Sequence, residues 1–567
     1  MKKKLPYGQS NYETLVNDNF LYVDKTKYIE TMENLHDRFI FFLRPRRFGK
    51  SLFTSVLENY YDVNKKNDFE KLFKNTYIGK NPTSEKNSCY ILKFNFSGLI
   101  TDTKEELVKS FSEQCNKSYD KFFKKYNLNF EYNKEGYPSD VFNSFLGKLE
   151  FEIDKPLYVI IDEYDHFANE LLSFKLDMFS EIISKTGFVR KFYEVLKIGT
   201  ESIVKRIFAT GVSPITLDSL TSGFNIASDF TKDPRFNEMM GFTEEEVRDL
   251  ILNIDESLEE NKVDSIVKRM KKNYNGYLFS VDSEKTLFNS DMVLYYLKSF
   301  EDFRKEPKEL IDKNIASDYA KLGNMFTLKN KDRNMEVLED VLSGEEITAV
   351  ITSQFSLEKD FDEDDFKSLL FYLGLLTIER EDLGDVVLKV PNNVIRELYF
   401  DFFGKKISEE IEYELNTSEI RGAMKTIAQK GDNTKLISIV ERTLNKLSKR
   451  DYIQFNEKYV KLIFLTYCFL SKLYLVKSEY EVENGFIDIA LLKQINVNPT
   501  FFAIFEHKYI KKKDYEEYGE KLVEEKLTEA KIQLKQYETA EELKNIKNLK
   551  KWAIVFAGEK CVANEEI

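Results

Sequence analysis

The alternation of apolar and polar positions changes along the chain. Up to about residue 289, short apolar runs rich in β-branched or aromatic residues alternate with longer amphipathic stretches, which is typical of a sheet covered by helices. The runs that predict buried parallel strands are residues 38–43, 90–96, 157–161 and 206–210. We therefore expect an α/β fold with a parallel sheet in this part of the chain.

A charged, helix-periodic pattern follows from residue 290 to about residue 440, and it predicts a mostly helical lid or spacer. A predicted hairpin at 376–393 interrupts this region. Gly384 marks its turn, and Pro391 ends its second strand. The region therefore separates two parts of the chain that contain predicted sheets.

The C-terminal pattern, from residue 441 to residue 567, predicts an α-β-β-β-α-β order. Its elements are expected at residues 456–473 (helix), 475–481, 486–492 and 501–507 (strands), 515–541 (charged helix) and 552–556 (strand). The predicted domains are therefore 1–289, 290–440 and 441–567.

Composition narrows the possible partners. Hydrophobic residues make up 42% and charged residues 32% of the 567 residues, which predicts a folded protein. The net charge of −13 argues against a broad basic surface for nucleic acid or membrane. Only 22 Gly and 10 Pro are present, which excludes long flexible linkers. Any nucleic-acid site must therefore be a local patch.

The cysteines and the apolar segments predict an intracellular, cytoplasmic protein without a membrane span. The four cysteines have no paired spacing, as expected for a reducing compartment. The charged start, MKKK, is not followed by an apolar core like that of a secretory signal. The longest apolar stretch, 459–476, carries Lys461 and Lys472 and is shorter than the roughly 20 residues of a spanning helix.

A candidate phosphate loop, RPRRFGKS, runs from Arg44 to Ser51, between the first predicted strand and a helix-prone run. A Walker A loop lies at this place, where backbone N–H groups and a helix N-terminus cradle phosphates. Gly49 would let the backbone approach the phosphates, Lys50 would reach the outer phosphates, and the Ser51 hydroxyl would hold Mg²⁺. The general pattern has glycine where this chain has Arg44, so GKS alone is a weak signal.

Two acids follow the apolar strand at 157–161, and they strengthen the case for a nucleotide site. In a Walker B arrangement, Asp162 would bind Mg²⁺, and Glu163 would orient or deprotonate the attacking water. Ionised carboxylates rarely end a buried strand without a partner. The next strand leads to Thr210 and Ser213, where such folds place a sensor of the γ-phosphate. The alternative is strand ends with incidental acids.

Six separated motifs carry a family resemblance. They are PYGQS (6–10), YVDKT (22–26), RPRRFGKS (44–51), TGVSP (210–214), LTSGFN (220–225) and YNGY (274–277). In this order they resemble the AAA-ATPase-like domain, which is usually joined to a C-terminal nuclease of the PD-(D/E)XK superfamily. RPRRFGKS is the usual form of the loop in that family. The resemblance implies a P-loop NTPase-like sheet that binds ATP, with Lys50 and Ser51 on the phosphates and Asp162 and Glu163 as Walker B acids.

Two carboxylates and a lysine form a second constellation near the C-terminus. Asp488 lies in one predicted strand, and Glu506 and Lys508 lie at the end of the next. Residues two apart in a strand share a face, so Glu506 and Lys508 point the same way and His507 points opposite. Two carboxylates suit Mg²⁺, and the lysine can orient water or stabilise the transition state of phosphodiester hydrolysis.

This constellation and the element order resemble the PD-(D/E)XK nuclease core, a restriction-endonuclease-like domain. Glu457 matches the position of an additional acidic metal ligand in some members, and Glu481 occupies a place that is often acidic. Gln533 and Tyr537 resemble a Gln-x-x-x-Tyr pair that faces the site in related nucleases. The chain departs at Phe486, where many relatives have Arg, which puts a phosphate contact in doubt.

Several interpretations stay open from the sequence alone. Strand-end acids with a nearby lysine also occur as structural ion pairs, and the KYIKKK run at 508–513 fits a phosphate contact and a solvated turn equally well. The first hypothesis is an ATP-binding module joined to a Mg²⁺-dependent nuclease acting on DNA or RNA. The second is a nucleotide-dependent regulatory or binding protein with a silent nuclease-like domain. A scaffold without either activity is a third. The resemblance also allows a homo-oligomer, and no arginine finger can be named.

Overall fold

The computed structural model describes residues 3–168, 171, 187–214, 226–307, 309–312, 315, 330–353, 355, 361–410, 416–447, 456–483, 485–494 and 497–567. The chain forms two compact units. The first comprises Met1–Asn334 and Thr348–Val394, and the second comprises Met335–Ile347 and Ile395–Ile567. The three-domain division at residues 289 and 440 stays a prediction.

A five-stranded sheet, parallel throughout, forms the centre of the first unit. Its strands are β1 (Phe39–Leu43), β2 (Tyr90–Asn95), β3 (Leu157–Asp162), β4 (Val204–Gly211) and β5 (Ser228–Asp229), in the order β2-β3-β4-β1-β5. Every residue of β3 is buried, as expected for a strand with helices on both faces. The order places β1 between β4 and β5, and ligands of such sheets bind beyond the carboxyl ends of the strands.

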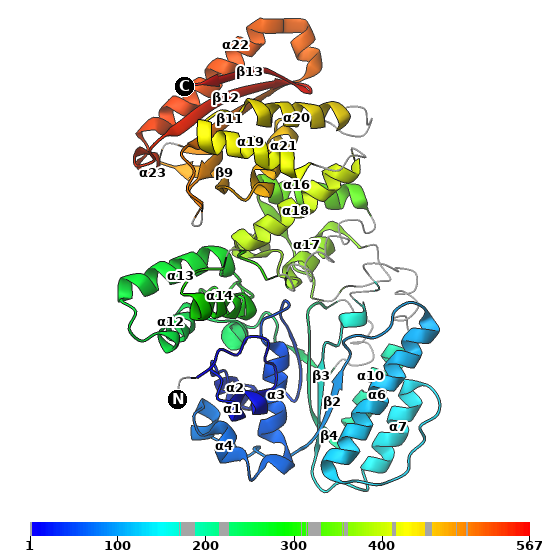
Figure 1. The fold of residues 1–567 in the computed structure, drawn as a ribbon. Coiled ribbons are helices and arrows are strands. Elements are labelled where there is room, and N and C mark those ends of the chain that lie inside the picture. The colour runs from blue at the N-terminus through cyan, green and yellow to red at the C-terminus, as the bar shows by residue number, and fades with distance from the viewer. Residues whose placement is uncertain are drawn as a thin grey trace. The chain divides into compact units, whose positions relative to one another are not determined.

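Helices cover both faces of this sheet. Figure 1 shows α3 (Lys50–Tyr61) on one face and α6 (Lys104–Tyr126), α7 (Pro138–Leu149) and α10 (Phe188–Gly199) on the other. The smaller helices of this part are α1 (Tyr12–Asn17), α2 (Lys27–Asn34), α4 (Phe69–Phe73) and α5 (Tyr77–Lys80). The side chain of Thr103 accepts a hydrogen bond from the Glu106 amide and caps α6, whose C-cap Asn127 is left-handed.

The rest of the first unit is helical, with a hairpin. Its helices are α12 (Glu244–Ile254), α13 (Glu260–Tyr274), α14 (Ser290–Phe303) and α17 (Glu363–Tyr372). Thr243 and Glu246 form a capping box that starts α12. Strands β7 (Thr377–Asp382) and β8 (Asp385–Lys389) form the predicted hairpin, and β6 (Ile347–Ala349) pairs beside β8.

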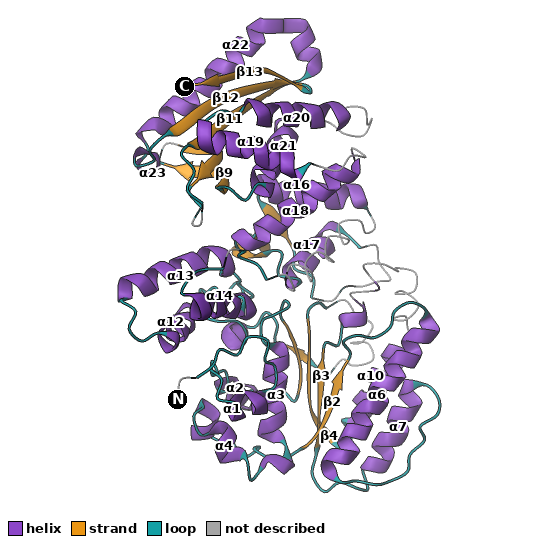
Figure 2. Cartoon of the chain, in the orientation of Figure 1, coloured by secondary structure: helices purple, strands orange, loops and turns teal. Residues whose placement is uncertain are grey.

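The second unit contains a mixed sheet between helical layers (Figures 1 and 2). Its strands are β9 (Leu475–Val482), β10 (Gly485–Leu492), β11 (Phe502–Ile510), β12 (Leu549–Ala557) and β13 (Lys560–Glu566), in the order β13-β12-β11-β10-β9. Its helices are α18 (Asn393–Glu410), α19 (Thr417–Lys430), α20 (Thr434–Leu447), α21 (Glu457–Leu470), α22 (Lys512–Gln536) and α23 (Glu541–Lys544). Three elements include residues of both units, namely α16 (Lys331–Ser343), β6 and α18.

The predicted fold class is confirmed. The four predicted N-terminal strands correspond to β1 to β4, and the predicted α-β-β-β-α-β order corresponds to α21, β9, β10, β11, α22 and β12. Three strands of the described chain were not predicted. β5 has two residues, β6 has three, and β13 is a charged strand at the sheet edge, so none of them produces an apolar run.

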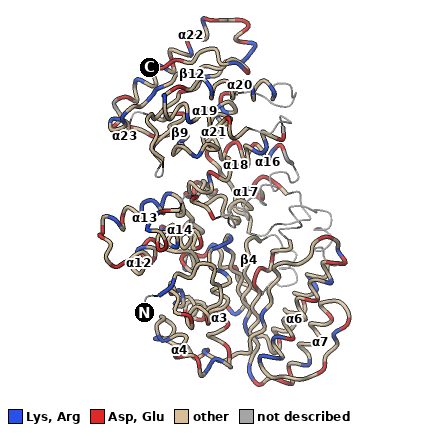
Figure 3. The backbone as a smooth tube through the Cα atoms, viewed as in Figure 1, with Lys and Arg blue, Asp and Glu red and all other residues tan. Residues whose placement is uncertain are grey.

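Charge is mixed along both units. Figure 3 shows Lys and Arg interspersed with Asp and Glu along the helices. Within the described ranges, no helix has the length and apolar character needed to cross a bilayer.

Candidate functional sites

The loop between β1 and α3 has the backbone of a phosphate-binding turn. Gly49, directly before α3, has a φ of 95°, in the left-handed region that glycine adopts without strain. The first amides of any α-helix have no partner within the helix and point outward from its N-terminus. The N-terminus of α3 therefore presents N–H donors and the positive end of a helix dipole to the carboxyl edge of the sheet.

Arg44 replaces the first Walker glycine, and its role is to anchor the loop. Its side chain is 1% exposed. The guanidinium stacks on Phe42 and Phe279 at 4.2 and 4.1 Å from the ring centroids. It donates hydrogen bonds to the carbonyls of Leu43 and Thr231 at 2.9 and 2.7 Å. Arg44 is thus committed to the protein interior and is not a phosphate ligand.

Lys50 folds back onto its own loop. Its Nζ donates to the carbonyls of Arg44 and Pro45, both at 3.0 Å. Burial lowers the pKa of Lys50, while Glu163, Asp165 and Asp162 oppose that shift. The ammonium therefore lies near Asp162, Glu163 and Asp165 and bonds to neutral carbonyls of its own loop.

The two acids after β3 differ in their surroundings. Asp162 is 1% exposed, and its Oδ1 has no hydrogen-bond partner among the described residues. Glu163 is half-buried beside the loop and has a φ of 55°. A left-handed conformation is strained in a residue other than glycine, and such strain concentrates at functional sites. Asp162 is therefore an acceptor that still needs a cation or a donor.

The predicted sensor residues have protein partners. The Thr210 hydroxyl donates to the Phe42 carbonyl at 2.7 Å, and the Ser213 hydroxyl donates to Asp165 at 3.1 Å. Asp165 also accepts from the amides of Val212 and Ser213, at 3.0 and 2.7 Å. Asp165 was not predicted as a site residue, although the acid-rich run DEYD at 162–165 was a signal for it. Residues 220–225, the LTSGFN motif, lie outside the described residues.

Segments distant in sequence hold the loop in place. The Gly241 amide donates to the Phe48 carbonyl at 3.1 Å, and the Asn289 side chain donates to the Arg46 carbonyl at 3.2 Å. The guanidinium of Arg47 lies 3.5 Å from Asp291 at the start of α14. These contacts link the loop to α14 and to the segment before α12.

The YNGY motif supports the same loop. Gly276 has a φ of 104°, and a Cβ there would lie 2.0 Å from the Pro391 carbonyl oxygen, so only glycine fits. Tyr277 packs edge-on against Phe48 with ring centroids 4.9 Å apart. The motif therefore acts through packing behind the loop.

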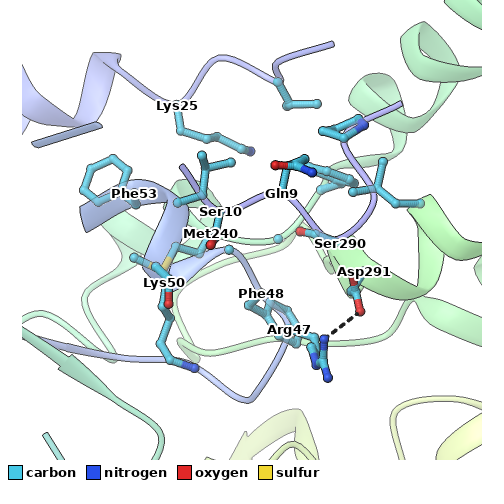
Figure 4. Close-up of a pocket in the computed structure, with 18 of the residues that line it drawn as sticks. Gln9, Ser10, Lys25, Arg47, Phe48, Lys50, Phe53, Met240, Ser290 and Asp291 are labelled. Carbon is cyan, nitrogen blue, oxygen red and sulfur yellow. Dashed lines mark hydrogen bonds and ion pairs between the residues drawn. The ribbon is translucent and has the colours of Figure 1, made fainter. Parts of the chain in front are cut away.

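A cavity of about 500 Å³ extends from the loop to the N-terminal segment. Figure 4 shows Arg47, Phe48 and Lys50 on one side of it and Gln9, Ser10 and Lys25 on the other. The rest of the wall is mixed, and its apolar part includes Leu21, Tyr22, Met240, Phe242, Leu250 and Leu294. A cavity of this size with an apolar part beside a phosphate loop suits a nucleoside triphosphate.

Lys25 of the YVDKT motif lies in this cavity wall. Its Nζ donates to the Glu238 carbonyl at 2.9 Å and pairs with Glu246 at 2.6 Å. Asp24 accepts from the hydroxyl of Thr26 at 2.7 Å and from the Tyr77 amide at 2.6 Å. The motif therefore fixes one wall of the cavity to α5 and α12.

In the second unit, β10 and β11 bring the predicted acids together. The antiparallel pair Ile489–Phe505 places Asp488 opposite Glu506 when the register is continued by one residue. The His507 amide donates to Asp488 Oδ2 at 2.7 Å. Burial and the charge of Asp488 raise the pKa of Glu506 to about 8. The two carboxylates thus interact closely.

Lys508 and His507 point in different directions, as the alternation predicted. Lys508 Nζ lies 3.2 Å from Glu506 Oε1. His507 is 1% exposed and packs against Phe464 with ring centroids 4.7 Å apart. Burial lowers the pKa of His507 to about 4, so the ring is neutral at pH 7. His507 is a core residue.

Helix α21 contributes further charged groups. Burial raises the pKa of Glu457, and the charges acting on it include those of Lys508, Asp488 and Lys461, which places it at the same site. Lys461 Nζ lies 3.0 Å from Asp488 Oδ1 and also pairs with Glu479 of β9. Neither Lys461 nor Glu479 was predicted as a site residue, and the one signal for Lys461 was a lysine within an apolar run.

The Gln-x-x-x-Tyr pair lies on the opposite helical layer. The Tyr537 hydroxyl donates to the Phe486 carbonyl at 2.7 Å, and burial, Glu506 and Asp488 raise its pKa. Gln533 Oε1 is buried without a hydrogen-bond partner among the described residues. Phe486 is 55% exposed, and Glu481, also exposed, faces it across the β9–β10 register.

Donor chemistry at both sites fits divalent cations. Glu506 is 2% exposed, and its Oε2 has no hydrogen-bond partner among the described residues. An unsatisfied buried acceptor costs about 1–3 kcal/mol, and an oxygen-ligand cation would satisfy it. Asp162 Oδ1, beside the phosphate loop, likewise has no hydrogen-bond partner among the described residues. In the described part of the chain, no group of three or more His, Cys, Asp or Glu is already arranged around one metal position.

Comparisons with known proteins match two separate parts of the chain. A predicted AAA-ATPase family model matches residues 6–221, and a PD-(D/E)XK nuclease superfamily model matches residues 455–566. An uncharacterized protein in the vnfD 5′ region of Azotobacter chroococcum mcd 1 is 26% identical over 248 residues, which cover 43% of this chain and 44% of that protein. The resemblance predicted from the sequence is confirmed: the chain carries an AAA-ATPase-like domain and a PD-(D/E)XK nuclease superfamily domain.

Proposed function

We propose that this protein binds ATP with Mg²⁺ in its first unit and hydrolyses phosphodiester bonds of DNA or RNA in its second unit. The observation that carries the nuclease half is Glu506 Oε2, a buried carboxylate oxygen that has no hydrogen-bond partner among the described residues and lies beside Asp488 and Lys508. The observations that support the ATP half are the Gly49 turn, the Lys50 ammonium and the cavity beside them.

In the nucleotide site, the amides at the start of α3 and the Lys50 ammonium would bind the phosphates. Lys50 would exchange its two carbonyl hydrogen bonds for charge-assisted bonds to phosphate oxygens, which are stronger. Ser51 and Asp162 would hold Mg²⁺, and Glu163 would orient the attacking water. The apolar cavity wall around Met240 would receive the base.

In the nuclease site, Asp488 and Glu506 would hold Mg²⁺, with Glu457 as an additional acid. The cation supplies charge stabilisation at the scissile phosphate and lowers the pKa of water. Lys508, held 3.2 Å from Glu506, would orient the attacking water or stabilise the charge that develops on the phosphate. Tyr537 fixes the start of β10 through the Phe486 carbonyl.

The alternative is a nucleotide-dependent regulatory protein whose nuclease-like domain is silent. The ion pairs of Lys461 and Lys508 with the acids favour this alternative if they persist when a divalent cation is present. In that case Asp488→Ala would leave function unchanged, while Lys50→Ala would abolish nucleotide binding.

The decisive assay uses plasmid, linear duplex and single-stranded DNA and RNA with Mg²⁺ or Mn²⁺, with and without ATP. The wild type is compared with Glu506→Ala and with Glu516→Ala, which replaces an exposed acid on α22 of the same unit. We expect metal-dependent cleavage by the wild type and Glu516→Ala and none by Glu506→Ala. Equal cleavage by the wild type and Glu506→Ala would refute the nuclease assignment. The scattered, buried or half-buried free cysteines support a cytoplasmic setting.

A further inference from the structure

Lys461 is an unusual lysine in the second unit. It lies in α21, where its neighbours Val460 and Leu462 are buried core residues, and it is itself 7% exposed. Lysine is rarely buried to this degree without a partner. Its ammonium therefore depends on specific carboxylates.

The carboxylates that hold Lys461 come from two strands. Its Nζ lies 3.0 Å from Asp488 Oδ1 on β10 and pairs directly with Glu479 Oε1 on β9. The other oxygen of Asp488 accepts from the His507 amide. The Lys461 ammonium thus occupies Asp488 Oδ1, the oxygen that does not accept from the β11 backbone. This is the oxygen with which Asp488 would bind a metal ion.

Glu479 has a left-handed backbone conformation, which is strained in a residue other than glycine. It lies between the pairs Ile487–Tyr480 and Ile489–Ser478, opposite Asp488, and its φ is 45°. A left-handed glutamate inside a strand interrupts the ladder and turns the side chain out of its regular direction. This distortion brings the Glu479 carboxylate to Lys461.

The neighbouring carboxylate differs. Glu506 shares only Oε1 with Lys508, and its buried Oε2 is without a partner among the described residues. Each acid therefore has a lysine ammonium on one oxygen, but the second oxygen of Asp488 is also bonded, whereas that of Glu506 is open among the described residues. A divalent cation held by the two acids would meet the Lys461 ammonium at Asp488.

We propose that Lys461 is an internal counter-ion that competes with the divalent cation for Asp488, and that Glu479 retains the ammonium when the cation binds. This proposal rests on the proposed nuclease function. Lys461 is a positioning residue, because it acts through Asp488 and contacts no reacting atom. The pair Lys461–Glu479 would set the concentration of divalent cation at which the site becomes occupied.

The competition makes opposite predictions for two variants. Without the ammonium, Asp488 is released for the metal, so Lys461→Met should bind Mn²⁺ about tenfold or more tightly than the wild type. Without the Glu479 charge, Lys461 has Asp488 as its remaining partner, so Glu479→Gln should bind Mn²⁺ several-fold more weakly. Lys461→Arg keeps the charge and should bind no more tightly than the wild type.

The test is calorimetric titration of Mn²⁺ alone into the full-length chain, without nucleotide or nucleic acid. Lys526→Met is the matched control, because Lys526 lies within the electrostatic range of Glu457 but pairs with Glu529 of its own helix. A gain in Lys461→Met that exceeds the gain in Lys526→Met supports the competition. Equal gains in the two variants, or no gain in Lys461→Met, would overturn it.

Two further arms separate this proposal from the nuclease assignment. Loss of Mn²⁺ binding in Asp488→Asn shows that the titrated site is the one described. If the wild type and Asp488→Asn bind Mn²⁺ equally, the metal site itself is wrong. If Lys461→Met does not fold, Glu479→Gln still decides: weaker binding supports the competition, and unchanged or tighter binding overturns it.

Discussion

The lysine of the phosphate loop and the two lysines of the second site have opposite kinds of partners. In the first unit, Lys50 bonds to two neutral carbonyls of its own loop. In the second unit, Lys461 and Lys508 pair with carboxylates. An ammonium that bonds to neutral carbonyls is not neutralised and can still attract an anion. An ammonium that pairs with a carboxylate neutralises its negative charge, which a metal ion could do in its place. The first site is therefore suited to phosphates and the second to a metal.

The largest expected effect is at Asp488. Asp488→Asn keeps the shape but removes the charge that would hold the metal, a loss of several kcal/mol of transition-state stabilisation, or more than about 1000-fold in rate. Cleavage kinetics with saturating Mn²⁺ measure the change. ATP binding should stay at the wild-type level, and a parallel loss of ATP binding would contradict the separation of the two sites.

The next effect is on stability, at Arg44. Arg44→Met removes hydrogen bonds to buried carbonyls and leaves them unsatisfied, so we expect the first unit to lose about 2–4 kcal/mol of unfolding free energy. Urea denaturation followed by far-UV circular dichroism measures it. Arg235→Met, at an exposed arginine of the same unit, is the control and should change little. An unchanged midpoint in Arg44→Met would show that the guanidinium does not anchor the loop.

Replacing Lys50 should affect only the anion site. Lys50→Met removes a charged hydrogen bond to phosphate worth about 1.5–3 kcal/mol, which corresponds to roughly 10- to 100-fold weaker ATP binding. Fluorescent-ATP titration with Mg²⁺ measures it. Mn²⁺ binding in the second unit should be unaffected. Wild-type affinity for ATP in this variant would remove the phosphate-loop assignment.

The smallest effect is the pH dependence of the metal-free second unit. Burial and Asp488 raise the pKa of Glu506 in the folded protein from its usual value of 4.5 to about 8. Between these two pH values the folded state keeps a proton on Glu506 that the unfolded state has lost. The stability that comes from this proton is present at low pH and is lost as the pH rises through about 8. Denaturation midpoints in EDTA at pH 5.5, 7 and 8.5 should therefore fall for the wild type and fall less for Glu506→Gln. Parallel curves would show that Glu506 is not held protonated.

The sequence predicted the strands better than it predicted the contacts at the sites. Buried strands such as β3 are continuous apolar runs and are visible in one dimension. The roles of Arg44 and Lys461 were not visible, because their partners lie far away in the sequence, at Phe279 for Arg44 and at Glu479 and Asp488 for Lys461. The role of a lysine in an apolar helix can be assigned only when the strands that pack against the helix are known.

The acids were predictable for a different reason. Asp162 and Asp488 lie within or at the end of strands, and an acid after apolar residues stands out against them. The distortion at Glu479 leaves no such signal, since a left-handed φ at a glutamate follows from tertiary contacts and not from local preference. The local sequence pattern therefore locates the acids, and only the fold shows which lysines pair with them.

The most direct test of the two-site account is a crossed titration. Mg²⁺-dependent binding of fluorescent ATP and calorimetric binding of Mn²⁺ alone are measured for the wild type, Lys50→Met and Asp488→Asn. The account predicts that Lys50→Met loses ATP binding and keeps Mn²⁺ binding, and that Asp488→Asn does the reverse. If either variant loses both ligands while it remains folded, or if both variants keep both, the account is contradicted.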